Sequence, residues 1–175
     1  MDKPLEIEYK FLIRYPDIPT LAAQPEYKCE KMLQLYLELP QKEEGFDKCR
    51  IRKVEGTSGI RYIKTFKQSL SDMTRIEIES EISENEFNTL SRYIRRGYNP
   101  IEKHRHSFTL SGFTYEVDVF PFWEDRAYLE IEVDSETTKP PLPDFITIIK
   151  DVTADKRYRN TALAQKIITE DIENI

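Results

Sequence analysis

The stretch PLEIEYKFLI, residues 4–13, alternates apolar and charged side chains with a period of two. In an extended strand, successive side chains point to opposite faces. One face of this segment is therefore apolar, and the other carries two carboxylates and an ammonium group, from Glu6, Glu8 and Lys10. Such a charged face either lies in solvent on a one-sided sheet or lines an enclosed polar cavity.

Period-two segments of this kind recur along most of the chain and predict eight strands. Gly56 to Gly59 and Ser111-Gly112 are expected to form hairpin turns, and residues 70–72 (LSD) a further polar connection. The predicted strands are residues 4–14, 30–39, 47–55, 60–68, 73–82, 100–110, 113–120 and 127–134. Eight strands with short connections indicate an antiparallel meander that can close into a barrel.

Helical signals occur in two segments outside these strands. Residues 83–96 (SENEFNTLSRYIRR) begin with Ser83 and Glu86 in capping-box spacing and continue with an apolar stripe. The proline-rich segment 139–143 (KPPLP) precedes a tail that we expect to be helical to about residue 172. The predicted class is mainly β (α+β), with one domain over residues 1–175.

Composition narrows the possible functions. The net charge of −6 argues against a general nucleic-acid binder, whose surface is usually basic. No apolar run reaches the length of a membrane span and the N-terminus has no signal-peptide core, so a cytoplasmic protein without a membrane partner is expected. Cys29 and Cys49 are then expected to be buried, reduced thiols. The five glycines form neither a Walker A loop nor a dinucleotide fingerprint.

Charged side chains are sorted by strand and by face. For one isolated strand a solvated face is the simpler explanation, but acidic pairs and basic pairs repeat on strand after strand. The acidic groups on the proposed faces are Glu6, Glu8, Glu77, Glu79, Asp118, Glu130 and Glu132. The basic groups are Lys10, Arg50, Arg52, Lys67, Arg75, Lys103, Arg105 and Lys156. Paired carboxylates suit hard divalent cations, and clustered Arg and Lys suit phosphate oxygens, so a nearly neutral interior could hold a metal ion with a polyanion.

These segments resemble the CYTH superfamily, the triphosphate tunnel metalloenzymes. EIEYK (6–10) matches the family's Glu-x-Glu-x-Lys signature, and eight more segments follow in order along nearly the whole chain. They are QLYL (34–37), RIR (50–52), KTFK (64–67), RIEIE (75–79), EKHR (102–105), YEVDVF (115–120), EIEV (130–133) and VTADKRYRN (152–160). The resemblance implies an eight-stranded antiparallel β-tunnel, closed as a barrel, with flanking helices and a C-terminal helical plug.

The resemblance also implies roles for individual residues. Glu6, Glu8, Glu130 and Glu132, joined by Asp118, are expected to bind Mg²⁺ or Mn²⁺. Glu77 and Glu79 are expected to assist at a second metal or through ordered water. Lys10, Arg50, Arg52, Lys67, Arg75, Lys103 and Arg105 are expected to bind the phosphate chain, and Lys156 to bring a basic group to one tunnel mouth. Tyr9, where many short members have Arg, points outward by alternation and is expected to affect packing alone.

The expected activity is metal-dependent hydrolysis of inorganic triphosphate to diphosphate and phosphate, which needs positioning and charge neutralisation but no covalent nucleophile. Thiamine triphosphate hydrolysis, cyclisation of ATP to cyclic AMP and non-catalytic polyphosphate binding remain as alternatives. The two organic substrates need a recognition surface, which Trp123 supplies if it stacks on them rather than packing over the barrel end. A lipocalin-like carrier fits poorly with charged inner faces. Outward-facing Ile and Tyr side chains suit either packing under helices or a homodimer interface.

Overall fold

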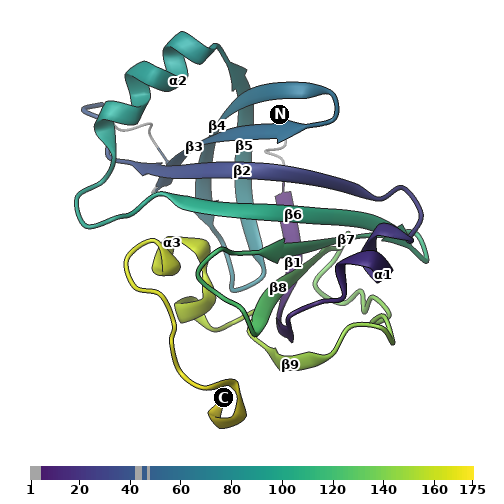
Figure 1. The fold of residues 1–175 in the computed structure, drawn as a ribbon. Coiled ribbons are helices and arrows are strands. Elements are labelled where there is room, and N and C mark those ends of the chain that lie inside the picture. Colours follow the sequence, from purple (N-terminus) through teal and green to yellow (C-terminus); the bar gives the residue numbers. More distant parts are fainter. Residues whose placement is uncertain (1–4, 42–44, 47) are drawn as a thin grey trace.

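The computed structural model describes residues 5–41, 45–46 and 48–175, and its strands form one sheet that is rolled into a barrel (Figure 1). Eight antiparallel strands make the ring in the order β5-β4-β3-β2-β6-β7-β8-β1. They are β1 (Leu5–Arg14), β2 (Lys28–Leu37), β3 (Lys48–Gly56), β4 (Gly59–Ser69), β5 (Thr74–Ile82), β6 (Ile101–Leu110), β7 (Phe113–Val119) and β8 (Arg126–Glu132). The predicted closed eight-stranded barrel is confirmed. Residues 4 and 47, at which two predicted strands begin, lie outside the described residues.

The first strand closes the ring because its two halves have different partners. Residues 8–14 of β1 pair with β8, and residues 5–7 pair with β5. A ninth strand, β9 (Ile148–Asp151), was not predicted, and it pairs with β1 at residues 11–13, beyond the part that β5 covers. The connections are as tight as expected: Gly56 pairs with Gly59, and both residues of the Ser111-Gly112 turn have positive φ, at 51° and 80°.

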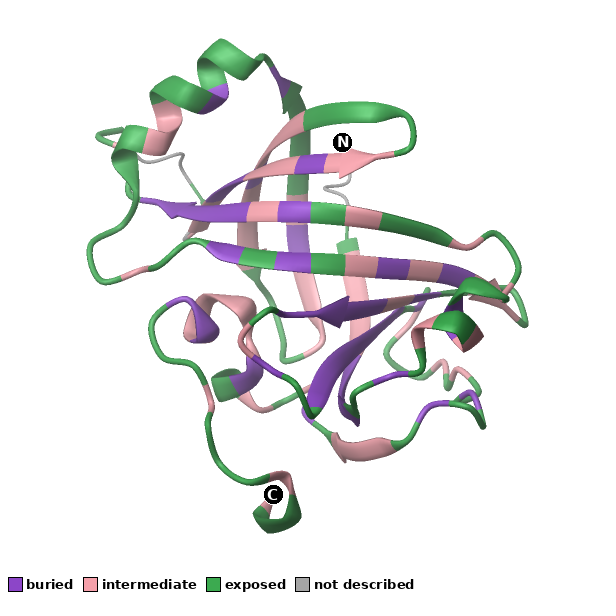
Figure 2. Ribbon diagram, viewed as in Figure 1, coloured by how far each residue is buried: buried purple, intermediate pink, exposed green. Residues whose placement is uncertain are grey.

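Three apolar clusters cover the barrel and leave its charged faces inside. The first lies on the outer wall of β1, β6, β7 and β8 under α1 (Ile18–Ala22), and it includes Phe11, Phe108, Tyr115, Leu129 and Ile131. The second joins the C-terminal segment to the end of the barrel and includes Leu12, Tyr36, Phe120, Trp123, Tyr128 and Tyr158. The third lies under α2 (Glu84–Leu90) and includes Leu35, Ile51, Ile82 and Phe87. In Figure 2, β8 is buried along nearly all of its length, whereas α2 is exposed on its outer side.

The predicted helix over residues 83–96 is wrong in its extent. Ser83 does cap α2, because its side chain accepts a hydrogen bond from the Glu86 backbone N–H. The α-helix ends at Leu90, a short 3₁₀ turn follows at Ser91–Tyr93, and Ile94 forms an isolated bridge with Leu37 of β2. The last residues of the predicted helix therefore do not form a helical turn, and Ile94 pairs with β2 instead.

The C-terminal tail is also not the helix that was predicted. After β9 it contains a 3₁₀ turn at Lys156–Tyr158, one turn of α3 (Asn160–Leu163) and a last 3₁₀ turn at Ile172–Asn174. Tyr158 and Leu163 are each 1% exposed in the second cluster, so this irregular segment is held by packing. It still covers one end of the barrel, as the term plug implies.

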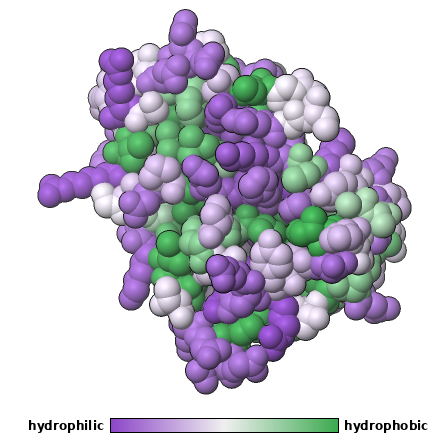
Figure 3. Space-filling model, viewed as in Figure 1, coloured by the Kyte–Doolittle hydropathy of each residue, from purple (hydrophilic) through white to green (hydrophobic). Residues whose placement is uncertain are grey.

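No helix within the described ranges is long and apolar enough to cross a lipid bilayer. On the face shown in Figure 3, hydrophobic side chains are interspersed with hydrophilic ones. Cys49 is half-buried and Cys29 is exposed, so the expectation of two buried thiols is wrong for Cys29; both thiols are free.

We predict that Ile131→Ala lowers the free energy of unfolding by about 2–5 kcal/mol, because it empties a fully buried position between β1 and β7. Chemical denaturation measures this. The matched control is Ile60→Ala, at a side chain that is 54% exposed, and it should change stability by less than about 0.5 kcal/mol. Equal effects of the two substitutions would contradict the assignment of the outer apolar wall as the core.

Candidate active site

The inner faces of the barrel strands enclose a cavity of about 380 Å³ that is lined mainly by charged side chains. Its carboxylates are Glu6, Glu8, Glu77, Glu79, Glu116, Glu130 and Glu132. Its basic groups are Lys10, Lys48, Arg50, Arg52, Lys67, Arg75, Lys103, Arg105 and Arg159. Charges that are far apart in the sequence thus share one enclosed space.

Strand register explains why these residues meet. Glu8 lies opposite Glu132 and Lys10 opposite Glu130 on the β1–β8 pair, and Glu6 lies opposite Arg75 where β1 meets β5. Because side chains alternate along each strand, one charged residue facing inward places every second neighbour inward as well. The charged faces of neighbouring strands therefore all point into the interior of the ring.

One network of ion pairs lies on β6, β7 and β8. Lys103 is 1% exposed and its Nζ lies 2.5 Å from Oδ2 of the fully buried Asp118. Arg105 donates to Asp118 at 2.7 Å and to Glu130 at 2.6 Å, and it also binds Glu116. Glu130 accepts a further bond from Lys10 Nζ at 2.8 Å. Each buried charge here has an opposite partner, which removes most of the cost of burial.

A second network lies on β3, β4 and β5. Arg50 donates to Glu77 at 3.0 Å and to Glu79 at 3.3 Å, and Arg52 donates to Glu79 at 2.5 Å. Lys67 also pairs with Glu77. These arginines and lysines are therefore held in position by carboxylates on the neighbouring strands.

The carboxylates at the β1–β8 seam are less well compensated than those of the two networks. Burial and the nearby carboxylate of Glu130 together raise the pKa of Glu8 to about 7, against the lowering effect of Arg75 at 2.9 Å. Burial also raises the pKa of Glu6, and it raises that of Glu132 together with the carboxylates of Glu6 and Glu77. By contrast, Lys10 and Arg105 hold the pKa of the buried Glu130 well below its usual range.

The same seam is the part of the cavity that could hold a divalent cation. Carboxylate oxygens are the donors that Mg²⁺ and Mn²⁺ prefer, and the raised pKa values of Glu6, Glu8 and Glu132 indicate that their burial is only partly compensated by nearby positive charge. Over the described residues, no three metal-binding side chains converge as an assembled ligand set, because most of the carboxylates bind Arg or Lys. Glu132 differs, since no ion pair to it is found in the described part of the chain. The donor chemistry fits a hard cation.

Two of the predicted site residues do not line the cavity. Asp118 is fully buried behind Lys103 and Arg105, so it orients these cations rather than facing the lumen. Lys156 is exposed on the 3₁₀ turn of the tail, and Arg159, three residues later, lines the cavity instead. The structure thus places Arg159, and not Lys156, in the cavity lining.

Sequence reasoning left several lining residues out of the site. Glu116 alternates with Asp118 on β7 and could have been found from that pattern. Tyr36 lies on the inner face of β2 with Gln34, but from the sequence alone an aromatic residue is expected in the apolar core. Thr153, Asn160 and Thr161 come from the irregular tail, where no periodicity marks a face.

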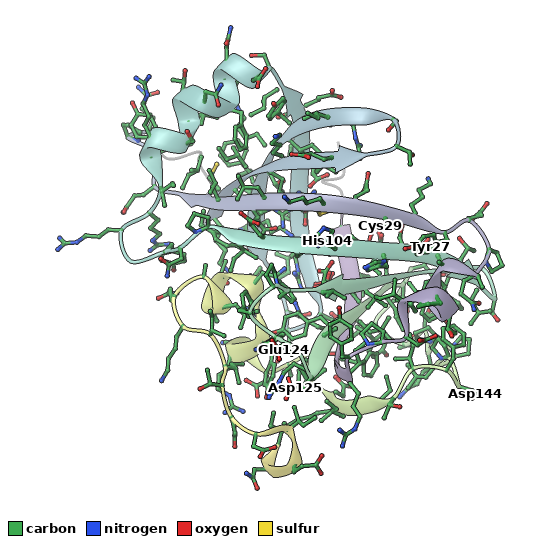
Figure 4. The ribbon with its side chains drawn as sticks, viewed as in Figure 1. Tyr27, Cys29, His104, Glu124, Asp125 and Asp144 are labelled. Atoms are coloured by element: carbon green, nitrogen blue, oxygen red, sulfur yellow. The ribbon has the colours of Figure 1, made fainter. Side chains whose placement is uncertain are left out.

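The remaining singled-out side chains lie away from the cavity. His104 is exposed on β6 between the inward-facing Lys103 and Arg105, and Figure 4 shows it with Cys29 on the β2–β6 wall. Trp123 is 5% exposed and its indole N–H donates to the Ile168 carbonyl at 2.9 Å. Tyr9 points outward and stacks near Phe11 with ring centroids 6.1 Å apart, as alternation predicts.

A closed antiparallel barrel whose interior pairs acidic with basic side chains is the fold of a triphosphate tunnel protein. This chain belongs to the CYTH domain family, which matches residues 4–153. The expected family membership is therefore confirmed.

Individual relatives agree with this assignment. An inorganic triphosphatase of Acetivibrio thermocellus is 32% identical over 162 residues, covering 91% of this chain and 93% of the relative. The crystal structure of the inorganic triphosphatase NE1496 superposes with a TM-score of 0.56 at 30% identity, covering 93% of this chain and 99% of the other. A Pyrococcus horikoshii protein, PH1819, has a TM-score of 0.55 at 22% identity and covers 75% of this chain and 80% of its own, which supports the fold alone.

We predict that Glu8→Gln stabilises the fold at neutral pH in buffer containing EDTA. A carboxyl group whose folded-state pKa is raised from 4.5 to about 7 destabilises the fold as pH rises through this window, and the amide does not ionise. The variant should exceed the wild type in unfolding free energy by on the order of 2 kcal/mol at pH 8, and the difference should disappear near pH 4.

Denaturant unfolding across this pH range measures the effect. Glu102→Gln, at an exposed position of β6, is the control and should show no such pH-dependent difference. A Glu8→Gln variant that is less stable than wild type at pH 8 would contradict the assignment of Glu8 as an undercompensated buried charge.

Proposed function

We propose that this protein hydrolyses inorganic triphosphate to diphosphate and phosphate in a reaction that depends on a divalent metal. The observation that carries the proposal is the enclosed cavity of about 380 Å³ with basic and acidic side chains facing each other across it. The inorganic triphosphatases among the relatives support the same substrate. A linear triphosphate is a small, densely charged anion, and the cavity lining offers it side chains from every strand of the ring.

The basic side chains would hold the phosphate chain. Arg50, Arg52 and Arg105 present planar guanidinium groups, which can bind two phosphate oxygens at once. Lys10, Lys67, Lys103 and Arg75 add further positive charge to the same lining. Phosphoryl transfer requires in-line positioning and neutralisation of charge on the equatorial and leaving oxygens, and these groups can provide both.

The carboxylates at the seam would hold the metal ion. Glu6, Glu8, Glu130 and Glu132 supply the oxygen ligands, and a bound Mg²⁺ or Mn²⁺ would neutralise phosphate charge and lower the pKa of a bound water. Glu77 and Glu79 face the same lumen from β5 and can orient the attacking water. Asp118 acts instead through Lys103 and Arg105, whose charged ends it fixes.

Lys10 is the basic group best placed to act on the reacting phosphate. Its ammonium lies 2.8 Å from Glu130 and 4.1 Å from the centroid of the Tyr128 ring, and the residue lines the cavity. The carboxylate and the aromatic face fix its position, so it can stabilise charge that develops on the leaving oxygen.

The organic substrates have less support. Trp123, the candidate for stacking on a base or a thiamine ring, is buried in the second apolar cluster, and its indole N–H is already bonded. It does not line the cavity. A purely non-catalytic binder of polyphosphate would have no use for the undercompensated carboxylates of the seam.

We predict that the purified protein releases phosphate from inorganic triphosphate with a kcat/KM at least about tenfold higher than from thiamine triphosphate or ATP. Among the described lining residues only Tyr36 is aromatic, and its ring is already packed in the second apolar cluster. A phosphate-release assay with Mg²⁺ or Mn²⁺ measures the preference, and EDTA should abolish the activity. A preference for ATP with cyclic AMP as product would overturn the proposal.

We further predict that Glu132→Gln raises the metal concentration needed for half-maximal activity by roughly tenfold, because one charged ligand becomes neutral. Glu132 forms no ion pair with any described residue, so its replacement breaks no such contact, whereas Glu130→Gln would leave Lys10 and Arg105 short of a partner. Titration with Mn²⁺ gives the half-maximal concentration. Glu102→Gln serves again as control, and an unchanged value for Glu132→Gln would remove Glu132 from the metal site.

A further inference from the structure

Among the described residues, Tyr36 is the one aromatic side chain that lines the charged cavity. It lies on β2 among acidic and basic lining residues, and its Cα pairs with that of Arg50 on β3. The ring packs in the second apolar cluster, with its centroid 5.9 Å from that of Tyr98, and the residue is 7% exposed. The ring therefore belongs to the wall of the barrel end, while the residue also borders the lumen.

The hydroxyl of Tyr36 is held by a buried glutamine. Gln34, two residues earlier on the same inner face, is completely buried, and its Nε2 donates a hydrogen bond to Tyr36 Oη. The other amide atom, Oε1, has no partner among the described residues. An unpaired buried amide oxygen is costly, so the placement of Gln34 is explained better by its bond to Tyr36 than by its own packing.

That bond leaves the hydroxyl hydrogen of Tyr36 free to donate. A phenol has one donor hydrogen besides its acceptor lone pairs, and Gln34 uses an acceptor position. No acceptor for this hydrogen is found in the described part of the chain. The nearby carboxylate of Glu130 is engaged by Lys10 and Arg105, one at each oxygen, and no hydrogen bond from Tyr36 to it is found among the described residues. The neighbouring Arg50 offers no acceptor at all.

We propose that Tyr36 donates this hydrogen bond to a non-bridging phosphate oxygen of the bound triphosphate, and that Gln34 is the residue that positions the hydroxyl. The proposal rests on the function proposed above and adds a neutral donor to its charged binding groups. Burial raises the pKa of Tyr36, so the hydroxyl stays protonated at neutral pH. The lumen arginines are already paired with carboxylates and must exchange these partners to bind phosphate. The Tyr36 hydroxyl has no such partner to give up among the described residues.

Tyr36→Phe removes only the hydroxyl and keeps the packed ring. We expect KM for inorganic triphosphate to rise about tenfold, the usual effect of losing one hydrogen bond to a charged group, with a smaller change in kcat. The matched control is Tyr98→Phe. Its hydroxyl also accepts from a glutamine amide, Gln165 Nε2 at 2.8 Å, in the same aromatic cluster, but it does not line the cavity. Its KM should equal that of the wild type.

An unchanged KM for Tyr36→Phe, or an equal rise for Tyr98→Phe, would overturn the proposal, because the effect would then be absent or a matter of aromatic packing. Thermal unfolding identifies a variant that fails to fold. If Tyr36→Phe fails, Gln34→Met keeps the test open: it should raise KM severalfold through the loosened hydroxyl, and an unchanged KM would overturn the proposal. In a folded Tyr36→Phe background, Gln34→Met should add no further rise in KM, and an independent rise would show that Gln34 does not act through Tyr36.

The wild-type protein separates this proposal from the proposed function. If it binds inorganic triphosphate in calorimetry without hydrolysing it, the proposed function fails, and the affinities of Tyr36→Phe and Tyr98→Phe then test Tyr36 directly. If it hydrolyses triphosphate and Tyr36→Phe behaves as wild type, only the role of Tyr36 fails. If it neither binds nor hydrolyses triphosphate, both proposals are overturned.

Discussion

The structure depends on mutual neutralisation of acidic and basic side chains inside a closed sheet. Burying one unpaired charge costs several kcal/mol, and this barrel encloses many charges of both signs. The cost is tolerable because charges of opposite sign meet across neighbouring strands. Arg105, for example, is bonded at once to Asp118, Glu116 and Glu130. An arginine lining without these carboxylates would repel itself, so the acidic residues are needed for the fold as well as for any metal.

Alternation in the sequence was enough to predict the barrel wall. A period of two leaves no choice of face once one face is apolar, and the apolar faces of β1 and β8 are indeed packed outward around Phe11 and Ile131. Alternation cannot predict the structure of segments in which apolar and polar residues do not alternate. The tail after residue 140 is ordered by contacts of Tyr158 and Leu163 with the barrel end, and β9 by pairing with β1. Long-range packing of this kind leaves no local pattern to detect.

The same distinction applies to the candidate site. Most of the strand residues that alternation placed on the inner faces line the cavity, but alternation does not measure depth. Asp118 has the inward parity of Glu116, yet it lies behind the two cations that it binds. Lys156 and Arg159 lie on an irregular turn, where only the three-dimensional path of the chain decides which of them reaches the cavity. Tyr36 was not predicted as a lining residue for another reason: a tyrosine can pack in an apolar core or line a polar lumen.

The ion pairs of the lumen also bear on how a substrate would bind. In the proposed function, a triphosphate replaces carboxylates as the partner of Arg50, Arg52 and Arg105, so each cation exchanges one anionic partner for another. The released carboxylates, left buried without compensation, then gain affinity for a divalent cation. By thermodynamic reciprocity the cation favours triphosphate binding to the same extent. An interior of paired charges thus couples anion binding to cation binding without any change of fold, and an interior of basic residues alone would not do so.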